Sequence, residues 1–445
     1  NTDITSAVTE AQARFTADNP KSQAQLDKAS NFMPGGNTRT VLFYPPFPLT
    51  MVRGEGCHLW DLDGHCYTDF LGEYTAGLFG HSHPIIRAAI DHTLDNGIVM
   101  GGQNQAEAEL ASAIVERFSS IERVRFTNSG TEANLMAVSA ARAFTQRTGV
   151  MVMSGGYHGS VFYFAPGGSP LNAPFPYVKG IYNDTDKCRD LIREQGMDLA
   201  CIIVEPMQGG GGCISGSQEF LDMLRMESEK TGTLLIFDEV VTGFRAAPGG
   251  VQERYGVRPD LTTLAKIVAG GLPGGAVGGK ADIIDMIAHR NDPDWDNNHR
   301  VYHPGTFNGN PLSAAAGSTA LEMIASQPIN QQADAMADRL KKGINEVLGK
   351  LEIPGHAHGI ASMIHVVLAD CDCNRELCTM SHVKIAEANA SPAVTAMKRG
   401  LQNRGVDIMS RETFLVSGTH TDHEIDQTLN AFEDTMAAVR ADGLV

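Results

Sequence analysis

Between about residues 85 and 282, predicted helices alternate with short apolar strands, and this alternation limits the fold more than any other feature of the chain. Three of the strands are Val150–Met153, Leu199–Val204 and Leu234–Asp238, which are mostly uninterrupted apolar runs. Such strands, separated by helices, are typical of a parallel sheet that is covered on both faces. The sequence therefore predicts an α/β domain whose ligands bind beyond the carboxyl ends of the strands.

One of these strands ends on two carboxylates. The apolar run Leu234–Phe237 is followed directly by Asp238 and Glu239, so Asp238 faces the edge where a ligand would lie. Lys266 follows a short polar segment and has apolar residues and glycine around it, a partly dry setting that suits an amine nucleophile. A lysine that forms a Schiff base and an aspartate for a pyridinium nitrogen are what pyridoxal phosphate requires. Taken singly, Asp238 is more commonly a helix cap and Lys266 a solvated surface lysine.

A candidate phosphate site follows the predicted strand Val124–Thr127. The segment Asn128–Asn134 begins an Ala-rich helix, and its turn Ser129, Gly130 and Thr131 offers backbone N–H groups, two hydroxyls and the positive end of the helix dipole. An ordinary N-cap has the same geometry, so both interpretations remain open from these residues alone.

A second glycine-rich turn, Ser154–Gly159, follows the strand Val150–Met153. Its two rings, Tyr157 and His158, are explained either by stacking on a planar cofactor or by local packing within the loop. The residues of the turn do not decide between these two explanations.

Six motifs carry a family resemblance. They are NSGTEAN, SGGYHG, VEPMQG, FDEVVTGFR, DLTTLAK and HPGTFNGNP. Their order and spacing resemble those of the class III, fold-type I aminotransferases, which depend on pyridoxal 5′-phosphate, and the likeness extends from about Pro34 to the C-terminus. Within that class the chain most resembles the branch that holds glutamate-1-semialdehyde aminomutase and the β-amino-acid aminotransferases, including those for β-phenylalanine.

The resemblance implies a fold-type I α/β architecture with two domains, and a chain of 445 residues is long enough for more than one core. We expect a large cofactor-binding domain over residues 76–325, with a mostly parallel sheet between helices. A smaller α+β domain would take residues 326–445. Residues 1–75, with helices and short strands, would belong partly to the small domain and partly to an active-site loop.

The resemblance also implies roles for individual residues. Lys266 would bind pyridoxal phosphate and then move the proton between substrate and cofactor, while Asp238 would pair with the pyridinium nitrogen. Ser129, Gly130 and Thr131 would bind the phosphate. Tyr157 and Val240 would contact the two faces of the ring, and Thr306 would reach the phosphate of the neighbouring subunit. A homodimer with shared active sites is therefore expected.

Substrate carboxylates are recognised best by arginine, because its fork of donors binds both oxygens. Arg39 lies in the loop GGNTRT, where the resembling enzymes carry a carboxylate-binding arginine, and Arg411 lies in a C-terminal loop where transaminases of this class often place theirs. Without that placement, a surface arginine is the preferred interpretation of each. The segment Val41–Phe47 and Tyr74 either line a pocket for an aromatic side chain or pack in the core.

Arg411 also bears on the reaction. The aminomutase moves an amino group within one substrate, and its C-terminal loop resembles SxFEAGF, whereas this chain has SRETFL at Ser410–Leu415. We therefore expect a transaminase that moves the amino group of a β-amino acid, 3-amino-3-phenylpropanoate, to 2-oxoglutarate or pyruvate by a ping-pong mechanism. The alternatives are glutamate-1-semialdehyde 2,1-aminomutase and a binding protein without activity, which the presence of Lys266 and Asp238 disfavours.

Composition excludes some partners. The formal net charge of −17 disfavours nucleic acid and anionic membranes. A signal peptide and a long apolar span are not apparent. The eight cysteines lie mostly in apolar runs, which is typical of reduced thiols, so we expect a cytoplasmic protein whose partners are small amino and keto acids.

Two clusters raise the question of a metal. Cys371 and Cys373 stand near Cys378, but CxCx4C lacks the paired CxxC spacing of zinc sites. His81 and His83 form a lone HxH in a polar loop, which is a weak signal. We therefore expect no metal.

Overall fold

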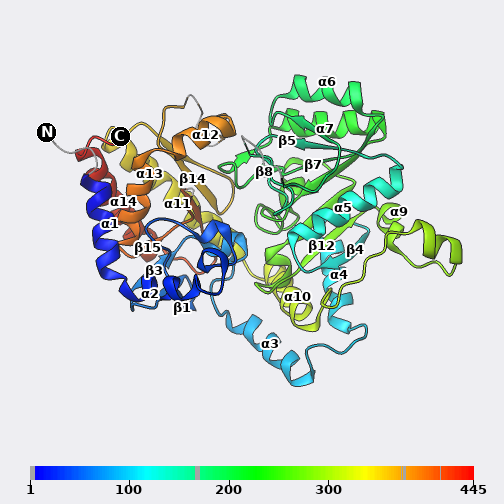
Figure 1. Ribbon diagram of the computed structural model, residues 1–445, viewed down its shortest axis with the longest axis horizontal. Coiled ribbons are helices and arrows are strands. Elements are labelled where there is room, and N and C mark those ends of the chain that lie inside the picture. Colours follow the sequence, from blue (N-terminus) through cyan, green and yellow to red (C-terminus); the bar gives the residue numbers. More distant parts are fainter. Residues whose placement is uncertain (1–5, 166–170, 372, 374–376, 411) are drawn as a thin grey trace. The chain divides into compact units, whose positions relative to one another are not determined.

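The chain folds into two compact units (Figure 1). The structure is a computed structural model and describes residues 6–165, 171–371, 373, 377–410 and 412–445. The large unit is Pro84–Pro328, and the small unit consists of Asn1–His83 together with Ile329–Val445.

Within the described residues, a seven-stranded sheet forms the centre of the large unit. In the order of their pairing, its strands are β4 (Arg123–Thr127), β12 (Gly275–Gly279), β11 (Leu261–Ala265), β10 (Leu234–Asp238), β7 (Leu199–Val204), β5 (Gly149–Met153) and β6 (Tyr177–Gly180). Neighbouring strands from β11 to β6 are parallel, and β12 runs antiparallel to both β11 and β4. The predicted mostly parallel sheet is therefore confirmed.

Every residue of β5, β7, β10 and β11 is buried, as expected for strands that are covered on both faces. The segment before Lys266, which the sequence analysis described only as short and polar, is strand β11. Its threonines are buried because their hydroxyls find partners inside the unit: Thr262 accepts from Gln252 Nε2 at 3.0 Å, and Thr263 donates to Asn134 Oδ1 at 2.6 Å.

Helices surround this sheet. They are α3 (Pro84–Asn96), α4 (Gln105–Arg117), α5 (Gly130–Thr145), α6 (Thr185–Gln195), α7 (Gln218–Thr231), α8 (Gly250–Tyr255), α9 (Ala281–Ile284) and α10 (Pro311–Ser326). Shorter turns and a small hairpin complete the unit, namely η4 (Lys266–Ala269), η5 (Asp285–Ile287), η6 (Trp295–His299), β8 (Met207–Gln208) and β9 (Ile214–Ser215). α10 packs against both α3 and α4, and α6 packs against α7 (Figure 1).

Helix α5 brings the candidate phosphate turn to the sheet. It contacts β7, β11 and β12, and its fully buried residues include Ala137 and Ala141, whose small side chains allow close approach. Because β4 and β11 both run antiparallel to β12, the strands β4, β10 and β11 end at the same edge. The first turn of α5, Asp238 and Lys266 therefore all follow strand ends at one edge of the sheet.

The small unit contains two sheets among its described residues. One pairs β1 (Met51–Glu55), β2 (His58–Asp61), β3 (Cys66–Asp69) and β15 (Val406–Asp407), and the other pairs β13 (His356–His358), β14 (Met363–Val367) and β16 (Thr413–Leu415). Its helices and short turns are α1 (Ser6–Asp18), α2 (Pro20–Ala29), η1 (Pro34–Gly36), η2 (Thr40–Leu42), η3 (Gly72–Thr75), α11 (Ile329–Lys350), α12 (His382–Asn389), α13 (Pro392–Gln402) and α14 (Asp422–Ala441).

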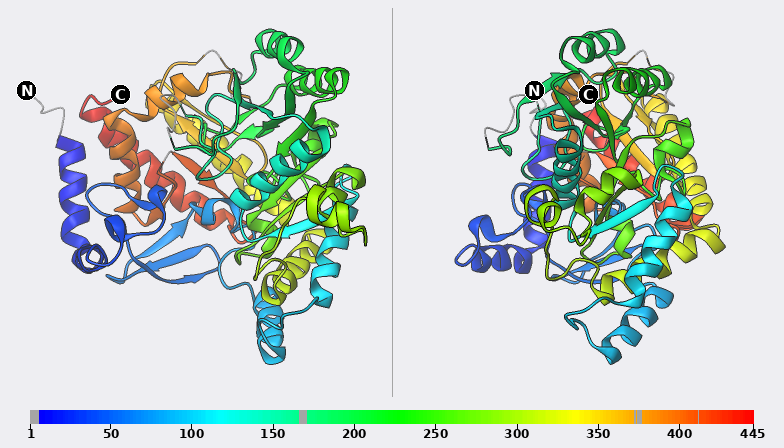
Figure 2. Two further views of the ribbon diagram at one scale, coloured as in Figure 1. Left: turned by 45° about the vertical axis from the view of Figure 1, so that its right-hand side comes forward. Right: turned by 90° about the vertical axis from the view of Figure 1, so that its right-hand side faces the viewer.

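Segments from both ends of the sequence build the core of the small unit. α1 lies along α13, which in turn packs against α14 (Figure 2). Phe70 from the N-terminal part packs with Phe414 and Phe432 from the C-terminal part in one buried cluster. Among the described residues, none of the helices is both long enough and apolar enough to span a membrane.

Candidate active site

Asp238 is the best-anchored polar group at the edge of the large sheet. It ends β10, and its side chain is 4% exposed. Oδ2 accepts hydrogen bonds from Asn134 Nδ2 at 2.9 Å and from His158 Nδ1 at 2.8 Å, and Oδ1 accepts from the backbone N–H of Val240 at 3.0 Å. A carboxylate held by three donors has one orientation, which a group that must face a cofactor requires.

Further hydrogen bonds connect this carboxylate to its surroundings. Asn134 lies on α5, accepts from the Thr263 hydroxyl at 2.6 Å, and also donates to the His158 carbonyl oxygen at 2.9 Å. The network therefore joins β10, β11, α5 and the glycine-rich turn. Asp238 and Thr263 are also register partners on adjacent parallel strands.

Lys266 is the first residue after β11 and begins the turn η4. Its backbone φ of 56° is positive, which for a residue other than glycine costs of order 1–3 kcal/mol and is found most often at functional sites. β10, which ends on Asp238, is the neighbouring strand, so the two residues that were predicted to act together leave the sheet side by side.

The N-terminus of α5 is compatible with both interpretations that the sequence left open. Ser129 is an N-cap, because its hydroxyl accepts from the Glu132 N–H at 3.2 Å, while Glu132 Oε2 accepts from the Asn128 N–H at 2.7 Å. The N–H groups of Gly130 and Thr131, in the first turn, have no acceptor within the helix. The cap thus leaves an anion-binding helix end, and the helix dipole adds to it.

Two glycines make room for the side chains that surround this helix end. A Cβ on Gly130 would lie 2.9 Å from Val240 Cγ2, so the close approach of Val240 to α5 requires glycine there. Gly159 has a φ of 120°, and a Cβ on it would collide with the side chain of Thr131. The predicted cofactor residues Gly130, Thr131 and Val240 therefore lie close together at the N-terminus of α5.

The two rings of the glycine-rich turn have different environments. Tyr157 is 48% exposed, and its backbone N–H donates to Glu205 Oε2 at 3.1 Å. His158 is 2% exposed and serves as the partner of Asp238, so it is not available for stacking. Burial raises the pKa of the Glu205 carboxyl to about 7, and among its charged neighbours His158 lowers it and Asp238 raises it.

From the sequence, no role was assigned to Asn134, Glu205 or Thr263, and stacking was the functional role considered for His158. Two of them had a usable signal. Asn134 lies four residues after Gly130 and hence on the same face of α5. Glu205 follows β7 directly, just as Asp238 ends β10, and so it lies at the same carboxyl edge of the parallel sheet.

The remaining predicted residue of the large unit, Thr306, is exposed in an irregular segment. The exposed Tyr302 and Phe307 lie in the same segment. Asn308 anchors the segment near the start of α5, because its Oδ1 accepts from Asn128 Nδ2 at 2.9 Å.

In the small unit, the predicted substrate residues Arg39 and Tyr74 lie together. Arg39 Nη1 contacts Glu73 Oε2 at 3.4 Å, and the Tyr74 hydroxyl lies 3.5 Å from the Val41 carbonyl oxygen. Burial raises the pKa of Tyr74 to about 12. Glu73, Tyr74 and Thr75 have consecutive positive φ angles, a strained turn of the kind that clusters at binding sites. Arg411, the other predicted arginine, lies outside the described residues.

Comparison with known proteins identifies the family. A model of the class III aminotransferase family matches residues 43–436, which include the network around Asp238 and Lys266. The chain belongs to the class III aminotransferases. Enzymes of this family use pyridoxal phosphate, so the predicted family, fold type and cofactor are confirmed for this aminotransferase.

Its relatives include two kinds of enzyme. The aminotransferase is 44% identical over 379 residues to the β-phenylalanine transaminase of Variovorax paradoxus. This match covers 84% of this chain and 85% of the relative. It is 36% identical over 436 residues to the glutamate-1-semialdehyde 2,1-aminomutase of Methanothermobacter thermautotrophicus. This match covers 94% of this chain and 100% of that enzyme. The crystal structure of the V. paradoxus β-phenylalanine aminotransferase matches it with a TM-score of 0.90 at 40% identity over 99% of both chains.

Proposed function

We propose that this aminotransferase moves the amino group of a β-amino acid, 3-amino-3-phenylpropanoate, to 2-oxoglutarate or pyruvate. The observation that carries the proposal is the 44% identity to a β-phenylalanine transaminase, together with a TM-score of 0.90 to a structure of that enzyme. The second candidate is glutamate-1-semialdehyde 2,1-aminomutase, which the relative at 36% identity supports.

Bound pyridoxal phosphate supplies an electron sink and a temporary acceptor for the amino group. Asp238 would receive the proton-bearing nitrogen of its ring, since the carboxylate is buried and fixed by Asn134 and His158. The first turn of α5 would hold the phosphate through N–H groups and the helix dipole. Val240 and Tyr157 would contact the two faces of the ring.

Lys266 would have two tasks. Its Nζ would hold the cofactor between turnovers, and it would then move the proton at the carbon that carries the amino group. Abstraction of this proton requires a neutral amine. Lys266 directly follows the buried strand β11 and is itself partly buried.

Arg39 would bind the carboxylate of the β-amino acid, and Arg411 the α-carboxylate of the acceptor. The contact between Arg39 and Glu73 leaves the two side chains 50% and 54% exposed. Exposed pairs of this kind contribute about 0–1 kcal/mol, so a substrate carboxylate that binds both guanidinium donors can replace Glu73. Tyr74, on the same turn, would contact the aromatic side chain of the substrate.

We also propose that the protein is a homodimer and that it is cytoplasmic. A homodimer would allow the exposed Thr306 of one subunit to reach the phosphate in the other. A cytoplasmic location would suit the eight cysteines, which all lie among the described residues and form no disulfide there.

The test measures glutamate formed from racemic 3-amino-3-phenylpropanoate and 2-oxoglutarate, with each substrate omitted in turn. We expect glutamate only when both are present, and none with Lys266→Ala. If glutamate-1-semialdehyde is instead isomerised without any added keto acid, while 3-amino-3-phenylpropanoate gives no glutamate, the aminomutase is the correct assignment.

The role of Arg39 has its own test. Removing a charge-assisted bidentate contact costs about 1.5–3 kcal/mol, so Arg39→Ala should raise the KM for the β-amino acid roughly ten- to a hundredfold. The KM for the keto acid should change little. Arg53→Ala, which removes another exposed arginine of the small unit, is the control. If only the KM for the keto acid rose, Arg39 would be assigned to the carboxylate of the keto acid and Arg411 to that of the β-amino acid.

A further inference from the structure

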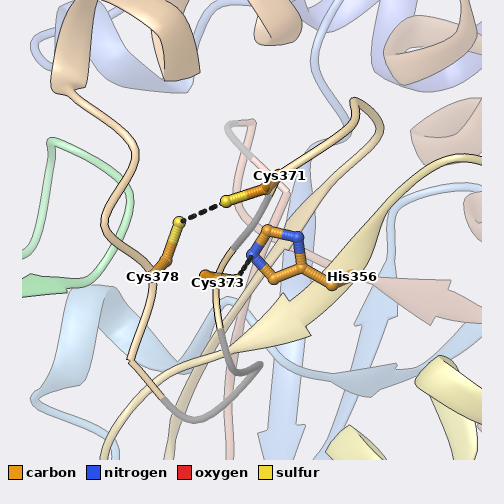
Figure 3. A group of neighbouring side chains, drawn as sticks. All are labelled: His356, Cys371, Cys373 and Cys378. Atoms are coloured by element: carbon orange, nitrogen blue, oxygen red, sulfur yellow. Dashed lines mark hydrogen bonds between the residues drawn. The ribbon is translucent and has the colours of Figure 1, made fainter.

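The small unit holds a cluster of soft metal ligands that the transaminase chemistry does not use. His356 comes from β13, and Cys371, Cys373 and Cys378 come from the segment between β14 and α12. One ligand atom of each residue lies within 4.8 Å of the others. Figure 3 shows the four side chains directed toward one another.

We propose that these four residues bind one Zn²⁺ ion. The Sγ atoms of Cys371 and Cys378 are 3.8 Å apart, and Cys373 Sγ lies 3.3 Å from His356 Nε2. With Zn–S bonds of about 2.3 Å and a Zn–N bond of about 2.0 Å, a tetrahedral site has ligand separations of roughly 3.8 Å between sulfurs and 3.5 Å between sulfur and nitrogen. The observed separations are therefore already close to those of a zinc site.

The ligand types select the metal class. Three cysteine sulfurs and one imidazole nitrogen form a soft donor set of the Cys₃His kind, which suits zinc and does not suit Ca²⁺ or Mg²⁺. Four protein ligands complete the tetrahedron, and no position remains for a reacting water. The ion would therefore have a structural role.

Burial is consistent with such a site. His356 is 3% exposed and Cys378 is 6% exposed, whereas Cys371 and Cys373 are half-buried.

Zinc binding would change the contact between His356 and its neighbour His358. His358 Nδ1 lies 3.1 Å from His356 Nε2, the same nitrogen that faces Cys373. Zinc would take the lone pair of that nitrogen, so the hydrogen bond between the two histidines would be replaced by the metal bond. His358 is 1% exposed and would remain beside the ion as part of its surroundings.

The fold explains why the sequence pattern predicted no metal. CxCx4C provides three ligands without the usual spacing, and the fourth is a histidine fifteen positions before the first cysteine. β13 and β14 pair antiparallel with His356 opposite Val367, which returns the chain to the histidine just before Cys371. The ion would thus tie the segment after β14 back to β13.

The experiment measures zinc bound per chain in the purified holoenzyme after incubation with zinc chloride and desalting. We expect one equivalent in the wild type and in Cys66→Ser, a control that removes an exposed cysteine outside the cluster. Cys378→Ser and Cys373→Ser should lose the ion on desalting. Cobalt in place of zinc should give the intense visible bands of a tetrahedral thiolate site in the wild type and in Cys66→Ser, and should not give them in Cys378→Ser or Cys373→Ser.

A second measurement on the wild-type protein does not depend on whether the variants fold. Zinc should protect Cys371, Cys373 and Cys378 from alkylation, and a chelator should remove that protection while Cys66 reacts throughout. The proposal is overturned if the wild type retains no zinc, if Cys378→Ser retains as much as the wild type, or if peptide mapping finds a disulfide between Cys371 and Cys378 after purification under reducing conditions.

Discussion

At the scale of single residues, the hydrogen bonds around Asp238 give the carboxylate of a common residue type one fixed orientation. An aspartate at the end of a buried strand has several rotamers, and by itself it need not face a ligand. Here Asn134 and His158 hold one carboxylate oxygen, while the N–H of Val240 holds the other. The carboxylate is thus positioned before any cofactor arrives, which reduces the reorganisation that binding requires.

Replacing Asp238 tests this positioning. Asp238→Asn keeps the shape but removes the charge that would face the ring nitrogen, and we expect kcat to fall roughly 10²-fold or more, the size of effect seen when a preorganised electrostatic partner is lost. Asp186→Asn, at a side chain that is 88% exposed, is the matched control. Steady-state kinetics at saturating cofactor measure the change, and a loss below about threefold would contradict the role.

Glu205 gives a prediction for the pH dependence of stability. Its carboxyl has a pKa of about 7 in the folded chain against an ordinary value of 4.5, with burial as the main cause. Between these two pH values the folded state holds a proton that the unfolded state has released, so this contribution to stability is present below pH 4.5 and is lost as the pH rises to about 7. At about 1.4 kcal/mol per pKa unit, the effect is at most a few kcal/mol.

Glu205→Gln removes this titration while it retains an acceptor for the Tyr157 N–H. We expect the thermal midpoint of the variant to change less between pH 5 and pH 8 than that of the wild type, in about the window set by the pKa values of 4.5 and 7. Equal pH dependence in both proteins would show that Glu205 is not the responsible group.

At the scale of elements, strands were predicted well where burial left a continuous apolar run. β7 and β10 have the predicted bounds, and β5 begins one residue before its prediction. β11 was missed because two threonines interrupt its apolar run, and only the tertiary partners of Thr262 and Thr263 explain their burial. Local pattern predicts a strand poorly when its polar groups are satisfied by distant residues.

The residues of the candidate site also differ in how well the sequence predicted their positions. The position of Lys266, Asp238 and the first turn of α5 at one edge of the sheet was predictable, because each lies at or just after a strand end, where α/β folds bind ligands. His158 and Asn134 were not assigned, since their roles depend on contacts over 80 and 104 positions of the sequence. His356 was not connected with the three cysteines for the same reason, because only the pairing of β13 with β14 brings them together.

The N-terminal turn of α5 provides a prediction at this scale. In Gly130→Ala the new Cβ would lie 2.9 Å from Val240 Cγ2, so the helix end and Val240 would have to separate. Overpacking of this kind costs about 1–3 kcal/mol, and we expect cofactor affinity to fall roughly ten- to a hundredfold.

The double variant Gly130→Ala with Val240→Ala is the control, because it restores the space. If the steric account is correct, it should recover part of the affinity that Gly130→Ala loses, as measured by titration of the cofactor into the apoenzyme. Additive losses from the two substitutions would contradict a contact between them.

At the scale of the whole molecule, the proposed homodimer makes a specific prediction. If Thr306 acts in the active site of the neighbouring subunit, a hybrid of one Lys266→Ala chain and one Thr306→Ala chain has one intact site, because the second chain supplies Lys266 and the first supplies Thr306. Isolated with two different tags, this hybrid should have about half the activity of the wild type.

The two parent variants are the controls. Lys266→Ala should be inactive, and Thr306→Ala should lose about 1.5–3 kcal/mol of phosphate binding, the range for a hydrogen bond to a charged group. If Thr306 acted within its own chain, each site of the hybrid would carry one substitution. The hybrid would then be no more active than the mean of its parents.

The most direct test of the account follows the two half-reactions separately. Cofactor-loaded enzyme is mixed with 3-amino-3-phenylpropanoate alone, and the visible absorbance of the lysine-bound cofactor is recorded before and after 2-oxoglutarate is added. We predict that the absorbance is lost with the amino donor and returns with the keto acid, with one glutamate formed per active site. An absorbance that neither compound changes would contradict the proposed transamination of a β-amino acid.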